Sequence, residues 1–386
     1  MAAIASLQMS TEVLFGSGCA AELLGARARQ LGAGRVFLVS DQGLVRAGII
    51  EQAEGWLKAA GLDVVTFAKV EPEPSLDGAA LCVALARQAE VHVVVGIGGG
   101  SVLDTAKVVA MLLRNPGSIE DYLGADRVPQ RGVPLILMPT TSGTGAESTR
   151  NALFFVPARR TKEAVISPLI VPPLAIIDPA LTVSVPPAVT AATGVDALCH
   201  AIEAYTGLNS NPLADAYALE AIRLIAMNLR RAVYAGQNLS AREGMALASF
   251  YAGVAIAFAG TNGVHALAYP LQGLNRIAHG VANSVLLPSV MAYNVPANLE
   301  RFARVAQQMG EPINHLSLRE AAEAGVRACR QLSVDIGIPQ HLGELGITAD
   351  QVDDLVAGAL QVTRLLKNNP RPLLAQNIEQ IFRQVL

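Results

Sequence analysis

At residues 91–101 the chain reads Val91-His-Val-Val-Val-Gly-Ile-Gly-Gly-Gly-Ser101, and an Ala- and Val-rich segment follows over residues 102–113. Branched apolar residues on neighbouring positions predict a strand buried on both faces, as in a parallel sheet covered by helices. The glycines stand where this strand passes into the next helix. Backbone N–H groups there can approach a ligand without a Cβ in the way, and the helix dipole favours phosphate. The segment therefore predicts an α/β fold with either a pyrophosphate site or only a tight turn.

The same alternation of short β-branched runs and Ala/Leu-rich segments extends outward on both sides. Strands are expected at 11–15, 35–40, 63–67, 134–138 and 174–178, and helices at 20–32, 43–60, 76–89 and 102–113. After Pro186 and Pro187 the strand pattern stops, and helical patterns follow at 188–205, 212–235, 240–258, 297–309, 317–335 and 349–365. We therefore expect an α/β dinucleotide-binding domain with a mostly parallel sheet over residues 1–182. An all-α metal-binding domain is expected over residues 183–386.

Composition narrows the class of protein. The chain has 386 residues, 52% of them hydrophobic and 16% charged, with a net charge of −3. So many apolar residues exclude disorder, and the lack of a basic excess makes nucleic acid an unexpected partner. Four scattered cysteines and an N-terminus without a leader pattern favour the cytoplasm. The apolar segment Ala246–Ala259 is too short to cross a membrane, so no membrane partner is expected.

An acidic residue follows the predicted strand at 35–40. Asp41 can accept hydrogen bonds from ribose hydroxyls, and its charge would repel a 2′-phosphate, which favours NAD over NADP. The usual acidic position about 20 residues beyond the glycines shows no strand pattern here. Asp41 equally suits a helix N-cap, because Asp is a preferred capping residue.

A second glycine loop follows the predicted strand at 134–138. It reads Pro139-Thr-Thr-Ser-Gly-Thr-Gly-Ala-Glu147. Several hydroxyls and a flexible backbone at the carboxyl end of a parallel strand suit contact with a ligand. A surface loop could have the same composition.

One acid and three histidines form a candidate metal centre. Asp196 and His200 are spaced i,i+4, which places them on one face of a helix. His265 and His279 would be roughly 21 Å apart on a continuous helix, so they can share an ion only if the chain turns between them. Residues that permit such a turn are Pro270, Gly273 and Gly280. This set suits Fe²⁺ or Zn²⁺ better than Ca²⁺ or Mg²⁺; the alternative is a capped Asp with three structural histidines.

Together these motifs resemble the iron-containing (group III) alcohol dehydrogenases over essentially the whole chain. The matching segments are the Gly98–Ser101 turn with Asp104 and Lys107, the Pro139–Glu147 loop, Thr193–Tyr205, Val264–Leu267, Ala278–Asn283 and Asn368–Pro372. Each segment alone is weakly specific, whereas the combination is specific.

The resemblance implies roles for individual residues. The metal ligands fall on Asp196, His200, His265 and His279. The NAD(P) contacts fall on Asp41, Gly98, Gly99, Gly100, Ser101, Thr140, Thr141, Thr144 and Lys162. Asn151 and Phe258 fall on positions of the substrate pocket. The family also implies an active site in a cleft between the two domains, and a homodimer.

Three positions depart from the family pattern. Tyr269 stands where many members have a histidine implicated in proton transfer. A phenol can relay a proton but is a poor base at its ordinary pKa of about 10, so Tyr269 serves the relay or shapes the pocket. Glu73 stands where relatives often have Asn near the cofactor. Arg150 either meets an acidic substrate, or is solvated or paired with a neighbouring acid.

The resulting prediction is a metal-dependent oxidoreductase that transfers a hydride between NAD(P) and a small alcohol or aldehyde. A polyol dehydrogenase or a sugar-phosphate lyase of the same superfold is the alternative enzyme. A lyase would need several basic groups for its phosphorylated substrate, and the expected cleft offers few beyond Lys162 and Arg150. A catalytically silent nucleotide- or metal-binding protein is the alternative outside the enzymes.

Overall fold

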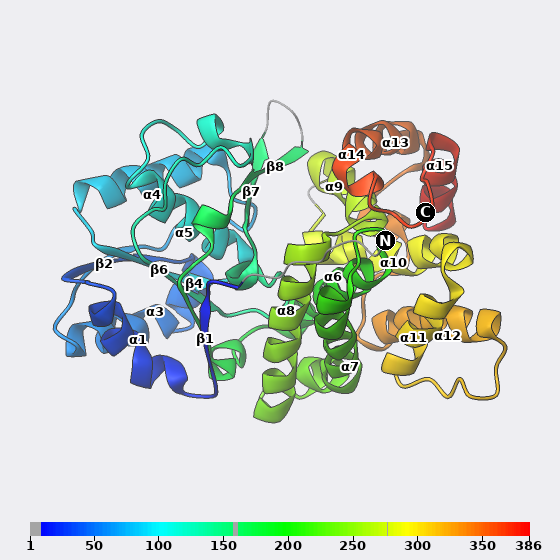
Figure 1. Ribbon diagram of the computed structural model, residues 1–386, viewed down its shortest axis with the longest axis horizontal. Helices are drawn as coiled ribbons and strands as arrows, with labels where there is room; N and C mark the ends of the chain where they lie inside the picture. The colour runs from blue at the N-terminus through cyan, green and yellow to red at the C-terminus, as the bar shows by residue number, and fades with distance from the viewer. Residues whose placement is uncertain (1–8, 157–160, 276) are drawn as a thin grey trace. The chain divides into compact units, whose positions relative to one another are not determined.

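The computed structural model describes residues 9–156, 161–275 and 277–386 (Figure 1). Its contacts divide the chain into two compact units. The α/β unit runs up to Thr141 and resumes over Gly145–Val185, and the helical unit comprises Ser142–Thr144 and Pro186–Leu386. The predicted fold class is confirmed: an α/β region with a parallel sheet precedes an all-helical region.

The α/β unit is built on a six-stranded sheet in the order β1-β9-β6-β4-β2-β3, and every neighbouring pair is parallel. The strands are β1 (Glu12–Phe15), β2 (Arg35–Val39), β3 (Asp63–Phe67), β4 (Val93–Gly98), β6 (Leu135–Pro139) and β9 (Leu174–Ile177). Their main helices are α1 (Cys19–Gln30), α3 (Ile49–Ala59), α4 (Leu76–Gln88) and α5 (Gly100–Leu112).

Alternate residues of the sheet enter two separate cores. Leu38 of β2 packs in one core with residues of α1 and α3, and Phe37 packs in the other with residues of α4 and α5. Figure 1 shows these helix pairs on opposite faces of the sheet. Covering both faces explains why β4 is buried along its whole length and reads as a continuous apolar run.

Two parts of this unit differ from the sequence prediction. The expected helix at 43–60 is divided into α2 (Gln42–Arg46) and α3, because Gly48 adopts φ 74°. That backbone conformation suits glycine and ends a helix. A second sheet of β5 (Gly124–Ala125), β8 (Thr161–Ile166) and β7 (Asn151–Val156) was not predicted. In it β7 and β8 pair antiparallel.

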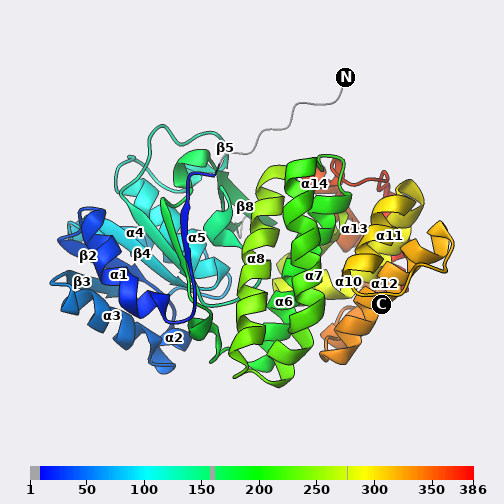
Figure 2. The same cartoon turned by 60° about the horizontal axis from the view of Figure 1, so that its bottom comes forward.

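Long helices rich in small residues make up the other unit. Its helices are α6 (Pro187–Thr206), α7 (Pro212–Tyr234), α8 (Leu239–Ala259), α9 (Gly263–Asn275), α10 (His279–Asn294), α11 (Leu299–Gln308), α12 (Leu318–Asp335), α13 (Val352–Gln361), α14 (Thr363–Leu366) and α15 (Ala375–Gln384). Helices α6, α7 and α8 lie side by side (Figure 2). At Gly194 a Cβ would lie 2.3 Å from Leu229 Cδ1, so glycine allows α6 to approach α7 closely.

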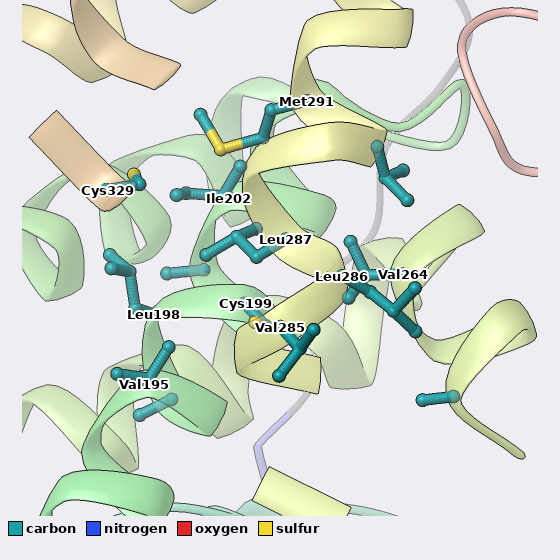
Figure 3. Close-up of a cluster of buried hydrophobic side chains, with 14 of the residues drawn as sticks. Val195, Leu198, Cys199, Ile202, Val264, Val285, Leu286, Leu287, Met291 and Cys329 are labelled. Carbon is teal, nitrogen blue, oxygen red and sulfur yellow. The ribbon is translucent and has the colours of Figure 1, made fainter. Parts of the chain in front are cut away.

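One part of the core of this unit lies between α6 and α10. Figure 3 shows the side chains of α6 and α10 packed against each other and against Cys329 of α12. The labelled residues of the two helices are Val195, Leu198, Cys199, Ile202, Val285, Leu286, Leu287 and Met291. Because α6 lies inside this core, its polar residues are buried as well, including Asp196 and His200.

In the described part of the chain, no single helix is long and apolar enough to cross a membrane. Helices α8 and α9 pass that test only as a pair, with a bend of 103° between them.

Candidate metal centre and dinucleotide site

Three helices bring the four predicted metal ligands together. Asp196 and His200 lie one turn apart on α6, as their spacing predicts. His265 is near the start of α9, and His279 is the first residue of α10. One ligand atom from each residue lies within 4.8 Å of the other three. The turn that this requires falls between the end of α9 and His279, whereas Pro270 is accommodated inside α9.

Close packing at the start of α10 supports this geometry. A Cβ at Gly280 would lie 2.3 Å from the carbonyl oxygen of Ala192, so only glycine lets α10 begin this near α6. His265 Nε2 lies 3.8 Å and His279 Nε2 lies 3.7 Å from Asp196 Oδ1. The rings of His200 and His265 are stacked, with their centroids 4.7 Å apart.

The charge states of Asp196 and His200 suit metal binding. Burial alone would raise the pKa of Asp196, but nearby His200, His279 and His265 and a hydrogen bond from Asn283 lower it to about 2. Burial lowers the pKa of His200, which favours its neutral form. A carboxylate and neutral imidazoles are the forms that bind Fe²⁺ or Zn²⁺. The donor set therefore fits such an ion.

Three buried polar residues that contact the candidate ligands were not predicted from the sequence. Glu203 Oε2 lies 2.5 Å from His265 Nδ1, and Gln272 Nε2 lies 2.6 Å from His279 Nδ1. Asn283 Nδ2 donates to Asp196 Oδ1 at 2.7 Å. The amide oxygens of two of these residues, Gln272 Oε1 and Asn283 Oδ1, are buried and lack a hydrogen-bond partner among the described residues. Glu203 and Asn283 lie in segments that resemble the family, but their spacing along the chain does not indicate that they contact the candidate ligands.

The two remaining predicted residues of the helical unit, Tyr269 and Phe258, are both half-buried. Tyr269 is half-buried, and its ring centroid is 6.2 Å from that of His279. Phe258 is half-buried against the helical core. Cys199 is fully buried in that core, where burial raises the pKa of its thiol. It therefore has a packing role beside the candidate ligands.

The glycine turn has the geometry that the sequence predicts. Strand β4 ends at Gly98 and helix α5 begins at Gly100. A Cβ at Gly98 would lie 2.5 Å from Val102 Cβ, so glycine is required for the tight passage into α5. The Ser101 hydroxyl donates to the carbonyl of Pro72 at 2.5 Å. The first turn of α5 thus presents backbone N–H groups, as a phosphate site requires.

The second glycine loop begins at the end of β6. Thr140 is buried, and its N–H donates to the carbonyl oxygen of Gly98 at 3.0 Å, which joins the loop to the glycine turn. Thr141 and Thr144 are half-buried. The Gly143 carbonyl oxygen lies 3.3 Å from His200 Nδ1. One short loop therefore carries predicted cofactor contacts and a partner of a candidate metal ligand.

Asp41 and Lys162 have protein partners in addition to their predicted roles. Asp41 is the N-cap of α2, and its Oδ1 accepts from the N–H groups of Gly43 and Leu44 at 2.7 and 3.1 Å. Lys162 Nζ forms an ion pair with Glu73 Oε2 at 2.6 Å. Both bonds of Asp41 use one oxygen, which leaves Oδ2 to accept from a ribose.

A buried ion pair supports the start of β7. Lys107 Nζ donates to Asp104 Oδ1 and Thr149 Oγ1, each at 3.2 Å, and to the carbonyl oxygen of Asn151 at 2.6 Å. This fixes the backbone of Asn151, the predicted pocket residue, to helix α5. The neighbouring Arg150 is exposed.

Comparisons with known proteins agree with these features. The family model described as iron-containing alcohol dehydrogenase matches residues 10–179, and the model for the C-terminal part of the same family matches residues 190–386. Long-chain-alcohol dehydrogenase 1 of Geobacillus thermodenitrificans is 43% identical over 357 residues, which cover 92% of this chain and 90% of that protein. NAD-dependent methanol dehydrogenase of Bacillus methanolicus is 38% identical over 373 residues, or 97% of each chain.

A solved structure extends the agreement to three dimensions. The crystal structure of a 1,3-propanediol oxidoreductase is 39% identical, superposes with a TM-score of 0.96 and covers 100% of both chains. Its likeness spans both the α/β and the helical regions. This chain belongs to the iron-containing alcohol dehydrogenase family.

Proposed function

We propose that this protein interconverts small alcohols and aldehydes, with NAD as the hydride carrier and Fe²⁺ or Zn²⁺ as the metal. The observation that carries the proposal is the convergence of one carboxylate and three imidazoles, with their ligand atoms within 4.8 Å of one another. Nitrogen and oxygen donors of this kind are the ligands that Fe²⁺ and Zn²⁺ take in catalytic sites.

Asp196, His200, His265 and His279 would hold the ion. A divalent cation at this site supplies Lewis acidity toward the substrate oxygen. The four side chains are buried except for part of His279, whose side chain is 23% exposed. Substrate access from the side of His279 is therefore part of the proposal.

The dinucleotide would be held by the Gly98–Ser101 turn, Thr140, Thr141, Thr144, Asp41 and Lys162. The nicotinamide supplies the hydride acceptor or donor when NAD is bound. Support for NAD over NADP comes from Asp41, which follows β2, because a 2′-phosphate near this carboxylate would meet a negative charge. The methanol dehydrogenase relative is also named as NAD-dependent.

Tyr269, Asn151 and Phe258 complete the proposal. The phenol of Tyr269, next to His279, would hold a proton for exchange with the substrate oxygen. Asn151, held at its carbonyl by Lys107, would orient the substrate, and Phe258 would shape the pocket.

The four cysteines are free, which suits a reducing cytoplasm. We expect a homodimer from the family resemblance.

Removal of single ligands tests the proposal. Asp196→Ala and His265→Ala should each lose bound metal and alcohol-dependent NADH formation together. His315→Ala is the matched control, because His315 is exposed and outside the group. Metal content is measured by elemental analysis and turnover by NADH absorbance. Full turnover in metal-free protein would contradict the proposal.

A further inference from the structure

A buried carboxylate outside the four candidate ligands contacts one of them directly. Glu203 lies on α6, one turn beyond His200, and its side chain is 2% exposed. Its Oε2 atom lies 2.5 Å from His265 Nδ1. Such a charge is costly to bury unless it is well paired, so its position requires a physical reason.

The contact determines which ring nitrogen of His265 is free. A neutral imidazole carries one proton, and the acceptor that it meets decides which nitrogen holds that proton. A carboxylate can only accept, so Nδ1 holds the proton and Nε2 keeps its lone pair. Nε2 is the atom of His265 that lies 3.8 Å from Asp196 Oδ1, in the candidate metal centre.

The second oxygen of Glu203 fixes the backbone beside the same ring. Oε1 accepts from the N–H of Val264 at 2.6 Å and from the N–H of His265 at 3.4 Å. These N–H groups are in the first turn of α9, where helical donors have no partner within the helix. One carboxylate therefore restrains both the backbone and the ring of His265. A glutamine could not do both, since its amide has a single acceptor oxygen.

We propose that Glu203 is a positioning residue of the metal centre, which holds His265 in its Nδ1-protonated form and directs Nε2 toward the ion. The inference rests on the proposed metal-dependent function. The Nδ1 atom of His200 also lies near an acceptor, the Gly143 carbonyl oxygen at 3.3 Å. This acceptor is weaker than a carboxylate because it carries no charge. Partners of this kind typically change metal affinity by about 10–100-fold when they are removed.

The first test compares Glu203→Gln with wild type. The dissociation constant for Zn²⁺ is measured by competition with a chromophoric chelator, and the visible spectrum is recorded with Co²⁺. The variant should bind Zn²⁺ about 10–100-fold more weakly, with an altered Co²⁺ spectrum. Glu220→Gln is the control, since Glu220 is a half-exposed residue of α7 paired with Arg223, and it should retain wild-type affinity.

Three outcomes distinguish a positioning role of Glu203 from a purely stabilising role and from failure of the proposed function. A variant with a lower Tm but an unchanged Zn²⁺ affinity and Co²⁺ spectrum would overturn the proposal, because Glu203 would then only stabilise the fold. Wild-type protein that binds no metal would instead contradict the proposed function. If Glu203→Gln does not fold, ¹⁵N-histidine NMR of Zn²⁺-loaded wild type provides the test. A proton on Nδ1 of His265 is expected, and a proton-free Nδ1 would overturn the inference.

Discussion

At the scale of single residues, Lys107 illustrates what a buried charge requires. Its ammonium group is fully buried and bonds Asp104, Thr149 and the Asn151 carbonyl. Lys107→Met keeps much of the side-chain volume but leaves Asp104 without its cation. We expect the free energy of unfolding to fall by about 3–5 kcal/mol, as for other broken buried pairs.

Urea denaturation measures this loss, and Lys58→Met is the matched control. Lys58 pairs with Glu54 on the surface of α3, with its side chain 60% exposed, so its loss should cost less than about 1 kcal/mol. Equal losses for the two variants would show that the buried pair does not stabilise the α/β unit.

Glu147 makes stability depend on pH. It is 1% exposed, and burial raises its pKa to about 7, despite the opposing effect of Lys107. Folding therefore favours its protonated form. Its stabilising contribution is complete below the unfolded-state pKa of about 4.5 and is lost as pH rises through about 7.

Glu147→Gln should remove this pH dependence. The variant should exceed wild type in free energy of unfolding by about 1–3 kcal/mol at about pH 8, and by little at about pH 5. Urea denaturation at both pH values checks the difference. A gain of the same size at both values would contradict the account. The exposed Glu51→Gln on α3 serves as the control.

At the scale of elements, the passage from β4 into α5 determines the dinucleotide site. Gly98→Ala would place a methyl group 2.5 Å from Val102 Cβ, so the turn must move. Overpacking of this kind typically costs about 1–3 kcal/mol. We expect NADH binding, followed by fluorescence, to weaken by about tenfold or more.

The control for this change is a glycine that lies within a helix of the same unit, away from the glycine turn. Gly55 on α3 is exposed, and a Cβ there would meet no atom within 4 Å. Gly55→Ala should raise the free energy of unfolding by about 0.5–1 kcal/mol and leave NADH affinity unchanged. Unchanged NADH affinity in Gly98→Ala would remove the glycine turn from the proposed site.

Elements with a strong local pattern were predictable. The expected helix at 188–205 is α6, Pro187–Thr206, because its apolar residues repeat over five turns and Pro187 suits a helix start. Helices α9 and α10 were missed because Pro270, Gly273 and Gly280 are typical of turns. Tertiary packing overrides that tendency: Pro270 lies inside α9 and packs so near Gly358 of α13 that a Cβ at Gly358 would lie 2.8 Å from Pro270 Cβ.

The same distinction applies to the candidate site. The Asp196–His200 pair follows from helical spacing alone, whereas joining it to His265 and His279 needed the family resemblance. Glu203 was not predicted because its contact with His265 joins α6 to α9, and the two residues are 62 positions apart in the sequence. Sequence periodicity reports which face a residue occupies, but it does not report which helix will pack there.

At the scale of the whole molecule, the proposed function requires one catalytic ion per chain. The direct measurement is stepwise addition of Fe²⁺, without oxygen, or Zn²⁺ to metal-free wild-type protein, with NADH formation from a short alcohol followed at each step. Activity should rise from near zero and level off at one equivalent of metal. Asp196→Ala should stay inactive throughout. Activity that is complete before metal is added would contradict the central claim.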